Sequence, residues 1–376
     1  MSNHSEAFVA FDSSKLRNAV AIAEAGRGGE VRFFGDVENS GTATAKLVKK
    51  LAAKYQRLTF CYEAGPTGYG LYRQIKSLDH ECIVVAPSLI PKRPGDKVKT
   101  NRRDAVNLAK LLRAGELTAV WVPDRHHEAM RDLTRAREAA MLDLRSKRQQ
   151  ISAFLLRQDV SYPEGKRTWT KTHLSWLASQ KLDYPEQRIA FEEMMLAMRQ
   201  AQERLARLEQ AIRAAVPDWS LTEMVTALMA MRGIDLIAAA TLLAEIGDLS
   251  RFQTSQQLMA YLGLVPSEDS TGDTIKRGPI TKAGNRRARR ILVECSWSYQ
   301  HPPRVGRDKQ PKVDAASPAV RDIAWKAQCR LHARYRALIR RGKLKTVAVT
   351  AVARELAGFI WAVGREIKPT ARVAAS

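Results

Sequence analysis

The stretch Phe8-Val9-Ala10-Phe11-Asp12 places an acidic residue directly after four apolar residues. The stretch Leu58-Thr59-Phe60-Cys61-Tyr62-Glu63 repeats this arrangement further along the chain. Short runs of apolar, aromatic and β-branched residues are typical of buried strands. We therefore predict two buried strands, each of which ends at a carboxylic acid.

A third acid opens a predicted helix. Asp104 lies in Asn101-Arg102-Arg103-Asp104-Ala105, at the start of a segment whose apolar residues have helical spacing. Carboxylates from separate strands and a helix can converge on one Mg²⁺ ion, which binds through a few oxygen ligands and keeps waters or phosphate oxygens. This pattern indicates a divalent-metal nuclease. Asn101 is also a good residue type for the N-cap of this helix.

The surrounding segments predict an α/β fold for residues 1–120, a mixed sheet flanked by helices. The predicted strands are 7–11, 19–23, 31–34, 58–62 and 82–86. The predicted helices are 42–55, 65–76 and 101–114. Residues 87–100 contain three prolines and three lysines, which indicates a loop that leads into the last helix.

Residues 121–216 carry two longer helical patterns. The first keeps one heptad register, interrupted at Arg137 and Lys147, and consists of Met130, Leu133, Ala140, Leu144, Ile151 and Phe154. The second alternates steps of three and four, and consists of Met198, Ala201, Leu205, Leu208, Ile212 and Ala215. Such spacing is typical of helices that pack along their length. We predict a coiled-coil and oligomerisation region, paired as a hairpin or against another subunit, in a homodimer or homotetramer.

Residues 217–376 are predicted to be mainly helical. Two helices, 221–232 and 237–246, flank the turn Gly233-Ile234-Asp235. A glycine turn before a helix N-terminus can present backbone N–H groups to a phosphate, as in helix-hairpin-helix units. The pattern also fits an ordinary helical hairpin, but the unit lies beside a strongly basic segment, which favours contact with a DNA or RNA backbone. The apolar helix expected over 347–363 is assigned to the core.

Basic residues concentrate in the same region. Between Lys276 and Arg341 there are 18 Lys and Arg against 4 Asp and Glu, which is more than half of the net charge of +23 carried by the 376 residues. Four aromatic residues interleave with them: Trp297, Tyr299, Trp325 and Tyr335. A solvated basic face is the alternative, but the charge imbalance and the aromatic residues favour nucleic-acid binding. The candidates for phosphate contacts are Arg277, Lys282, Arg286, Arg287, Arg289 and Arg290.

Composition disfavours other classes of protein. No apolar run approaches the roughly 20 residues that span a bilayer, and the first six residues lack the features of a signal peptide. The four cysteines are far apart and form no C-x-x-C pair, so we expect reduced thiols and no zinc site. We expect a cytoplasmic protein without a membrane partner.

Several motifs together resemble the DEDD transposases of bacterial insertion sequences, in the large family numbered one hundred and ten. The sequences of these motifs are most similar to the eleven-eleven subgroup. The motifs follow one another in the same order as in the family, and they cover nearly the whole chain. The matching stretches are Phe11-Asp12, Tyr62-Glu63-Ala64-Gly65, Lys99-Thr100-Asn101-Arg102-Arg103-Asp104-Ala105, Ala114-Gly115-Glu116-Leu117, Leu262-Gly263-Leu264-Val265-Pro266-Ser267 and Ile280-Thr281-Lys282-Ala283-Gly284-Asn285.

The resemblance implies a RuvC-like domain of RNase H fold in residues 1–120, the coiled-coil region in 121–216 and a transposase domain with a serine motif in 217–376. It also implies a structured non-coding guide RNA that pairs with donor and target DNA. Asp12, Glu63 and Asp104 match the metal-binding acids, with Mg²⁺ as the expected cofactor. Asn101 stands where the family usually has a fourth acid. Its carbonyl oxygen can still ligate Mg²⁺, but with less charge we expect a weaker hold on a second ion.

The resemblance implies a serine nucleophile in Pro266-Ser267-Glu268-Asp269-Ser270-Thr271-Gly272. We favour Ser270, because a primary hydroxyl attacks phosphorus with less crowding than the secondary hydroxyl of Thr271. Thr271 stays open, because relatives often have Ser directly before the glycine, and Ser267 is a third hydroxyl. A hydroxyl-rich turn with side-chain capping is the structural alternative.

We therefore expect a DNA transposase that acts at the bacterial nucleoid and joins strands through a phosphoserine intermediate. One alternative is a RuvC-like structure-specific nuclease, which would use activated water and form no covalent adduct. A second is a nucleic-acid-binding transposase relic weakened at Asn101. A third, a sugar-kinase-like ATPase suggested by Asp12 with Lys15, lacks the glycine-rich turn.

Overall fold

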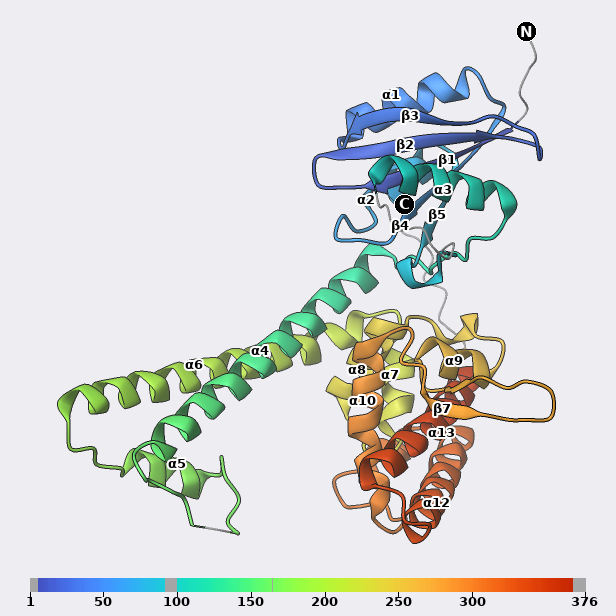
Figure 1. The fold of residues 1–376 in the computed structure, drawn as a ribbon. Coiled ribbons are helices and arrows are strands. Elements are labelled where there is room, and N and C mark those ends of the chain that lie inside the picture. Colours follow the sequence, from blue (N-terminus) through green and yellow to red (C-terminus); the bar gives the residue numbers. More distant parts are fainter. Residues whose placement is uncertain (1–5, 92–99, 164, 368–376) are drawn as a thin grey trace. The chain divides into compact units, whose positions relative to one another are not determined.

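The computed structural model describes residues 6–91, 100–163 and 165–367 (Figure 1). The chain forms two compact units, Met1–Val122 and Pro123–Ser376. The predicted ranges 121–216 and 217–376 fall almost entirely within the second unit, and their separation into two domains stays a prediction. Residues 92–99 of the predicted loop, including Lys99 of the motif, lie outside the described residues.

The first unit contains the predicted mixed sheet, with strand order β3-β2-β1-β4-β5. The strands are β1 (Glu6–Ser13), β2 (Arg17–Glu24), β3 (Val31–Glu38), β4 (Arg57–Glu63) and β5 (Glu81–Val85). β1, β4 and β5 are parallel, whereas β2 is antiparallel to both β1 and β3. The helices are α1 (Gly41–Ala52), α2 (Gly70–Ser77) and α3 (Asn101–Ala114), with the short 3-10 helix η1 (Pro87–Leu89). The predicted element order is confirmed.

The two faces of this sheet carry side chains of different size. Large residues lie on the face that packs against α1 and α2, and they include Val9, Phe11, Val20, Ile22, Phe60 and Tyr62. Small residues lie on the opposite face, against α3, and they include Ala10, Ala19, Ala21, Ala23 and Cys61. Successive strand residues point to opposite faces, so the alternation of these residues along β1, β2 and β4 separates the two cores. The small residues let α3 lie close to the sheet.

The second unit begins with two long helices that pack against each other, α4 (Arg125–Leu156) and α6 (Pro185–Ala215). They are antiparallel, because Arg137 pairs with Glu209 near one end and Gln187 donates to Gln158 near the other. The predicted hairpin is therefore present. The interruption of the heptad at Arg137 is explained by its ion pair with Glu209 across the two helices.

The rest of this unit is mainly helical, as predicted. Its helices are α5 (Lys171–Ala178), α7 (Thr222–Met229), α8 (Leu236–Ile246), α9 (Ser255–Tyr261), α10 (Arg286–Ser296), α11 (Gln310–Asp314), α12 (Pro318–Arg340) and α13 (Lys345–Glu366). The 3-10 helices are η2 (Val216–Asp218), η3 (Leu249–Arg251) and η4 (Trp297–Gln300). β6 (Pro266–Glu268) and β7 (Arg277–Ile280) form a small antiparallel hairpin.

Helix α13 is longer and more apolar than the sequence pattern suggested. Within the described residues it is one helix that is long and apolar enough to cross a membrane, and half of its most apolar window is buried. Val349, Val352, Leu356 and Ile360 lie in the hydrophobic core of the second unit. This confirms the predicted core role, and the helix reaches this length although no uninterrupted apolar run of the sequence approaches roughly 20 residues. The full length of the helix is not evident from the sequence, because Arg354 and Glu355 divide its apolar residues into two shorter runs.

Candidate functional site

Asp12 and Glu63 lie at the same edge of the sheet. β1 and β4 are adjacent parallel strands, and the last paired residues are Phe11 and Tyr62, directly before the two acids. Neighbouring strands lie about 4.8 Å apart, so the backbones of the two acids are close. Because side chains alternate, both acids share the face of Ala10 and Cys61, which is the face covered by α3.

Asp104 is held in the first turn of α3. The other end of α3 is fixed by Arg113, whose Nη1 donates to the carbonyls of Glu24 at 3.2 Å and Gly29 at 2.8 Å. Glu24 pairs with Ala7 at the beginning of β1. Helix α3 therefore runs antiparallel to β1, and its first turn lies towards the strand end that carries Asp12.

Asn101 is the first residue of α3, and the N-cap is Thr100, whose hydroxyl accepts a hydrogen bond from the Arg103 backbone N–H at 3.3 Å. The interpretation of Asn101 as the N-cap was wrong by one residue. Because Thr100 caps the helix, the exposed side chain of Asn101 is not needed to satisfy the backbone N–H groups at this helix end.

The three acids fit a hard divalent cation by chemistry and by their shared edge and face. In the part of the chain that the structure describes, however, no group of three or more His, Cys, Asp or Glu side chains is gathered closely enough to hold a metal ion. Carboxylates are the ligands that Mg²⁺ prefers. Asp12 and Glu63 are therefore suitable metal ligands at one edge of the sheet, but the described side chains do not form a complete set of metal ligands.

The serine motif forms the β6–β7 hairpin, in which residues 267–279 are all exposed. Ser270 Oγ donates to Glu268 Oε1 at 3.1 Å and accepts from the Lys276 backbone N–H at 3.2 Å. Glu268 in turn pairs with Arg277 Nε at 3.3 Å. Ser267 Oγ donates to the Pro279 carbonyl at 3.1 Å. The Ser270 hydroxyl thus contacts both a carboxylate and a backbone N–H of the facing segment, an arrangement that also fits the alternative of a turn with side-chain capping.

Two glycines fix the base of this hairpin. Gly263 and Gly284 have φ of +63° and +81°, which favour glycine. A Cβ on Gly263 would lie 2.0 Å from the Ala283 carbonyl oxygen, and one on Gly284 would lie 1.9 Å from that of Tyr261. The two family motifs therefore cross in backbone contact. Glycine at these two positions therefore allows the close backbone contact that positions the β6–β7 hairpin and the start of α10.

The six basic candidates lie in different environments. Arg277 pairs with Glu268, and Arg289 Nη1 donates to the carbonyls of Leu262 at 2.8 Å and Ala283 at 3.3 Å. Burial lowers the pKa of Arg289. Arg287 and Arg290 both pair with Glu138 of α4.

Lys282 and Arg286 are exposed, and among the described residues neither has an ion pair or hydrogen bond from its side chain. These two candidates are therefore the most accessible to phosphate, while Arg289 supports the fold.

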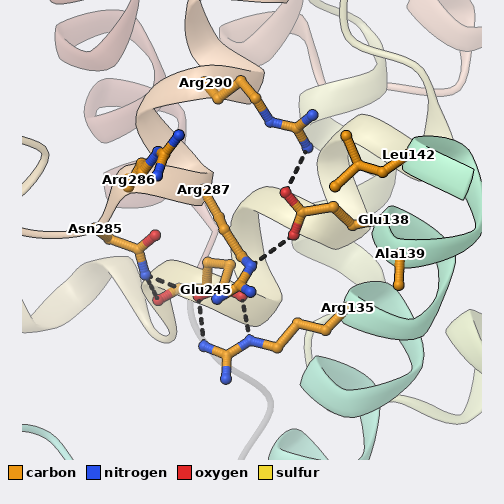
Figure 2. Close-up of a pocket in the computed structure, with 9 residues that line it drawn as sticks. All are labelled: Arg135, Glu138, Ala139, Leu142, Glu245, Asn285, Arg286, Arg287 and Arg290. Atoms are coloured by element: carbon orange, nitrogen blue, oxygen red, sulfur yellow. Dashed lines mark hydrogen bonds and ion pairs between the residues drawn. The ribbon is translucent and has the colours of Figure 1, made fainter. Parts of the chain in front are cut away.

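A pocket of about 600 Å³ lies between α4, the end of α8 and the start of α10 (Figure 2). At its base the buried carboxylate of Glu245 accepts two hydrogen bonds from Arg135, at 2.7 and 3.0 Å, and one from Asn285 at 2.8 Å. Burial opposes ionisation of Glu245, but the hydrogen bonds from Arg135 and Asn285 hold its pKa below the ordinary value. Arg135, Glu138, Glu245 and Asn285 were not among the predicted site residues.

A signal for this pocket was present in α4. Arg131, Arg135 and Glu138 follow one another at steps of four and three, which places them on one face of the helix. Arg131 Nε donates to the Ala244 carbonyl at 2.9 Å, so this polar stripe packs against the C-terminal end of α8. The apolar heptad residues lie on another face of α4, which packs against α6.

The Gly233 turn connects α7 and α8 as expected, with φ of +78°. A Cβ on Gly233 would lie 2.3 Å from Ser298 Oγ and 2.4 Å from the Cys295 carbonyl oxygen. The carboxylate of Asp235 already accepts from the Ala238 N–H at the start of α8. This geometry favours an ordinary helical hairpin over a phosphate-binding one.

Comparison with known proteins identifies two family regions. Residues 9–158 match a family described as "Transposase" and designated DEDD_Tnp_IS110, and residues 225–309 match the "Transposase IS116/IS110/IS902 family". The chain is 57% identical over 370 residues to "Putative transposase y4qE" of Sinorhizobium fredii, across 98% of this chain and 91% of that protein. It is 31% identical over 311 residues to the "Transposase for insertion sequence element IS1533" of Leptospira borgpetersenii, across 80% and 88%.

A shorter match, 36% over 61 residues, joins it to the "Transposase for insertion sequence element IS1111A" of Coxiella burnetii, across 16% of this chain and 17% of that protein. The sheet with its flanking helices is consistent with the RNase H-like part of such enzymes. The chain therefore belongs to the IS110/IS1111 family of insertion-sequence transposases.

Proposed function

We propose that this transposase cuts and rejoins DNA strands through covalent attack by Ser270. The observation that carries the proposal is the hydrogen bond from Ser270 Oγ to Glu268, whose other oxygen pairs with Arg277. In the proposed step the Ser270 oxygen forms a bond to phosphorus, and the bond from phosphorus to the 3′-oxygen of the DNA breaks. A 3′-hydroxyl of another strand then attacks the phosphoserine and releases Ser270. One phosphodiester is exchanged for another, so no ATP is needed.

The neighbouring hydroxyls support this assignment less well. Ser267 Oγ donates to the backbone of β7, and it packs so closely on Gly278 that a Cβ there would overlap it at 2.4 Å. Thr271 bridges to Thr274 through two backbone hydrogen bonds. Ser270 is the hydroxyl of the three that faces a carboxylate.

We propose that Asp12, Glu63 and Asp104, with the carbonyl of Asn101, hold Mg²⁺. The bound ion would neutralise phosphate charge and stabilise the leaving oxygen. Asp12 and Glu63 share one strand edge, and α3 brings its first turn towards the same edge. These placements support a common role for the acids.

The proposed partners are donor DNA, target DNA and a structured guide RNA, bound by a homodimer or homotetramer in the bacterial cytoplasm at the nucleoid. The net charge of +23 supports polyanionic partners. The heptad residues of α4 and α6 pack within one chain, but Leu156, Ile189 and Leu196 stay exposed there, and these apolar side chains support the oligomer.

The decisive experiment incubates the protein with guide RNA, both DNAs and Mg²⁺, and separates the products on denaturing gels. The wild type and Thr271→Ala are expected to give a covalent protein–DNA species, and Ser270→Ala is expected to give none. Persistence of the adduct in Ser270→Ala would show that another hydroxyl attacks.

The same experiment separates the alternatives. Cleavage without any adduct would identify a RuvC-like nuclease that uses water. Nucleic-acid binding without cleavage would identify a relic. If weak metal binding at Asn101 limits the enzyme, Asn101→Asp should lower the Mg²⁺ concentration needed for half-maximal strand exchange.

A further inference from the structure

We propose that the pocket between α4 and α10 binds one unpaired nucleotide of a nucleic-acid strand, and that Glu138 competes with its phosphate. The inference rests on the proposed function in taking nucleic acid as the ligand. It adds a second site, distinct from the serine hairpin and from the acids of the sheet.

The charge of the pocket favours an anion. Four arginines and two carboxylates line it: Arg135, Arg286, Arg287, Arg290, Glu138 and Glu245. Glu245 is 2% exposed and is already bound by Arg135 and Asn285. The remaining acid, Glu138, pairs with Arg287 and Arg290, while Arg286 lies away from it on the side of Asn285 (Figure 2). The four arginines outnumber the two carboxylates, so the pocket carries excess positive charge.

Two of these arginines retain unused donors. Arg286 is exposed and makes no ion pair or hydrogen bond from its side chain among the described residues. The Nε of Arg290 is buried and has no hydrogen-bond partner. Guanidinium groups present several N–H donors in a fork that matches phosphate oxygens. A phosphate group in the pocket would satisfy Arg286 directly, and the buried Nε of Arg290 would become a donor to it once the Arg290 side chain turns towards the pocket.

The shape of the pocket excludes a bare phosphate as its full occupant. Its volume of about 600 Å³ is within the range of small-molecule sites. The α4 wall carries Ala139 and Leu142, and Leu142 is 48% exposed although it is a large apolar residue. An apolar wall opposite a row of guanidinium groups fits a nucleotide, with the nucleoside on α4 and the phosphate on α10.

Glu138 occupies the position that the phosphate would take. Its Oε2 accepts from Arg287 Nε at 2.5 Å, and its Oε1 lies 3.0 Å from Arg290 Nη2. Its side chain is 17% exposed, so solvent screens these ion pairs only in part. A phosphate that binds Arg287 and Arg290 must displace this carboxylate. Removal of the Glu138 charge should therefore strengthen binding, which is the opposite of what loss of a structural contact would do.

The test measures binding of a short labelled single strand to the full-length protein in EDTA, by fluorescence anisotropy across a range of salt concentrations. Arg287→Gln should weaken binding about tenfold, as for loss of one charge-assisted contact, and should lower the salt slope by about one. Glu138→Gln should tighten binding by about threefold to tenfold. Matched controls are Arg204→Gln and Glu203→Gln, which change exposed charges on α6 and should leave affinity within about twofold.

A second readout locates the base. A strand that contains 4-thiothymidine, or 4-thiouridine in the RNA arm, is irradiated, and the cross-linked peptides are mapped by mass spectrometry. We expect cross-links on the α4 segment with Ala139 and Leu142, and fewer in Leu142→Ser. The DNA and RNA arms identify the strand that the pocket prefers.

Weaker binding by Glu138→Gln, or cross-links that avoid α4, would overturn the proposal. Inorganic phosphate that displaces the strand as well as a mononucleotide does would overturn the role of the apolar wall. Because binding in EDTA needs neither Mg²⁺ nor Ser270, failure here leaves the covalent mechanism intact. A missing adduct in the strand-exchange experiment likewise leaves this pocket intact.

Discussion

At the scale of single residues, the serine hairpin depends on two positions without side chains. Gly263 and Gly284 let the chain segments before β6 and after β7 touch through their backbones. The hydrogen bonds from Lys282 N to Gly263 O at 3.1 Å and from Thr281 N to Val265 O at 2.9 Å hold this crossing. The hydroxyl of Ser270 is thus placed by residues that take no part in the chemistry.

We predict that Gly284→Ala destabilises the protein strongly. The new Cβ would overlap the Tyr261 carbonyl oxygen at 1.9 Å, at a φ of +81°. Strain and displacement of this backbone should lower the free energy of unfolding by about 3 kcal/mol or more. Urea unfolding monitored by circular dichroism measures this loss.

Gly272→Ala is the matched control for that measurement. Gly272 also has a positive φ, +57°, but a Cβ there meets nothing within 4 Å. It should cost only about 1 kcal/mol, the usual penalty of a left-handed residue. Equal losses for the two variants would contradict the close crossing.

At the scale of helices, α4 joins two different neighbours through two faces. Its apolar face packs against α6, with Leu144, Ile151 and Phe154 in their shared core. Its polar stripe binds the end of α8, where His127 Nε2 lies 3.0 Å from the Ala244 carbonyl oxygen. Burial lowers the pKa of His127, although its contact with the Ala244 carbonyl acts in the opposite direction.

We predict that the contact between α4 and α8 weakens in acid. The pKa of Glu245 is held below its ordinary value near 4.5 by Arg135 and Asn285, although burial opposes this. Its ionised form therefore contributes stability that is fully present above about pH 4.5 and is lost as the pH falls through the lower folded pKa. Glu245→Gln should cost about 1 to 3 kcal/mol at neutral pH.

Thermal unfolding of the wild type and Glu245→Gln at several pH values tests this. The difference in Tm should be largest near neutral pH and should shrink at lower pH. Asp322→Asn is the control, because the pair of Asp322 with Lys326 is exposed, at 69% and 70%, and is expected to contribute little. A Tm difference that does not depend on pH would contradict the role of the ionised carboxylate.

At the scale of the whole molecule, the chain consists of two units with separate cores. The first unit packs both faces of its sheet with its own helices. The second unit builds one large cluster from α7 to α13, with Met130 of α4 and Ile212 of α6, and a smaller one between α4, α5 and α6. Each of these clusters draws its described residues from one side of the division after Val122.

We predict that residues 1–122 fold alone. A sheet with helices on both faces buries its apolar surface without the second unit, so the fragment should unfold in one cooperative transition. Circular dichroism against urea, together with dispersed amide resonances in NMR, measures this. A fragment that lacks a cooperative transition would show that the sheet needs the rest of the chain.

The sequence by itself determined the strands and helices of residues 1–120, the two long helices α4 and α6, and the position of the acids along the chain. Alternation along β1 and β4 fixes which residues enter the sheet, and the end of each strand fixes where Asp12 and Glu63 lie. Heptad spacing likewise fixed α4 and α6. These features are periodic, and a repeat of two or of about 3.6 residues is visible in a sequence without its tertiary structure.

Only the tertiary structure decided which charges meet. The Arg135–Glu245 and Glu138–Arg287 pairs join residues 110 and 149 positions apart, and the crossing at Gly263 and Gly284 depends on backbone approach. Such contacts leave no period in the sequence, because any arginine and any carboxylate can form an ion pair once the fold brings them together. The arginines predicted to contact phosphate therefore lie in three environments. Arg289 binds backbone carbonyls, Arg287 and Arg290 pair with Glu138, and Arg286 is exposed.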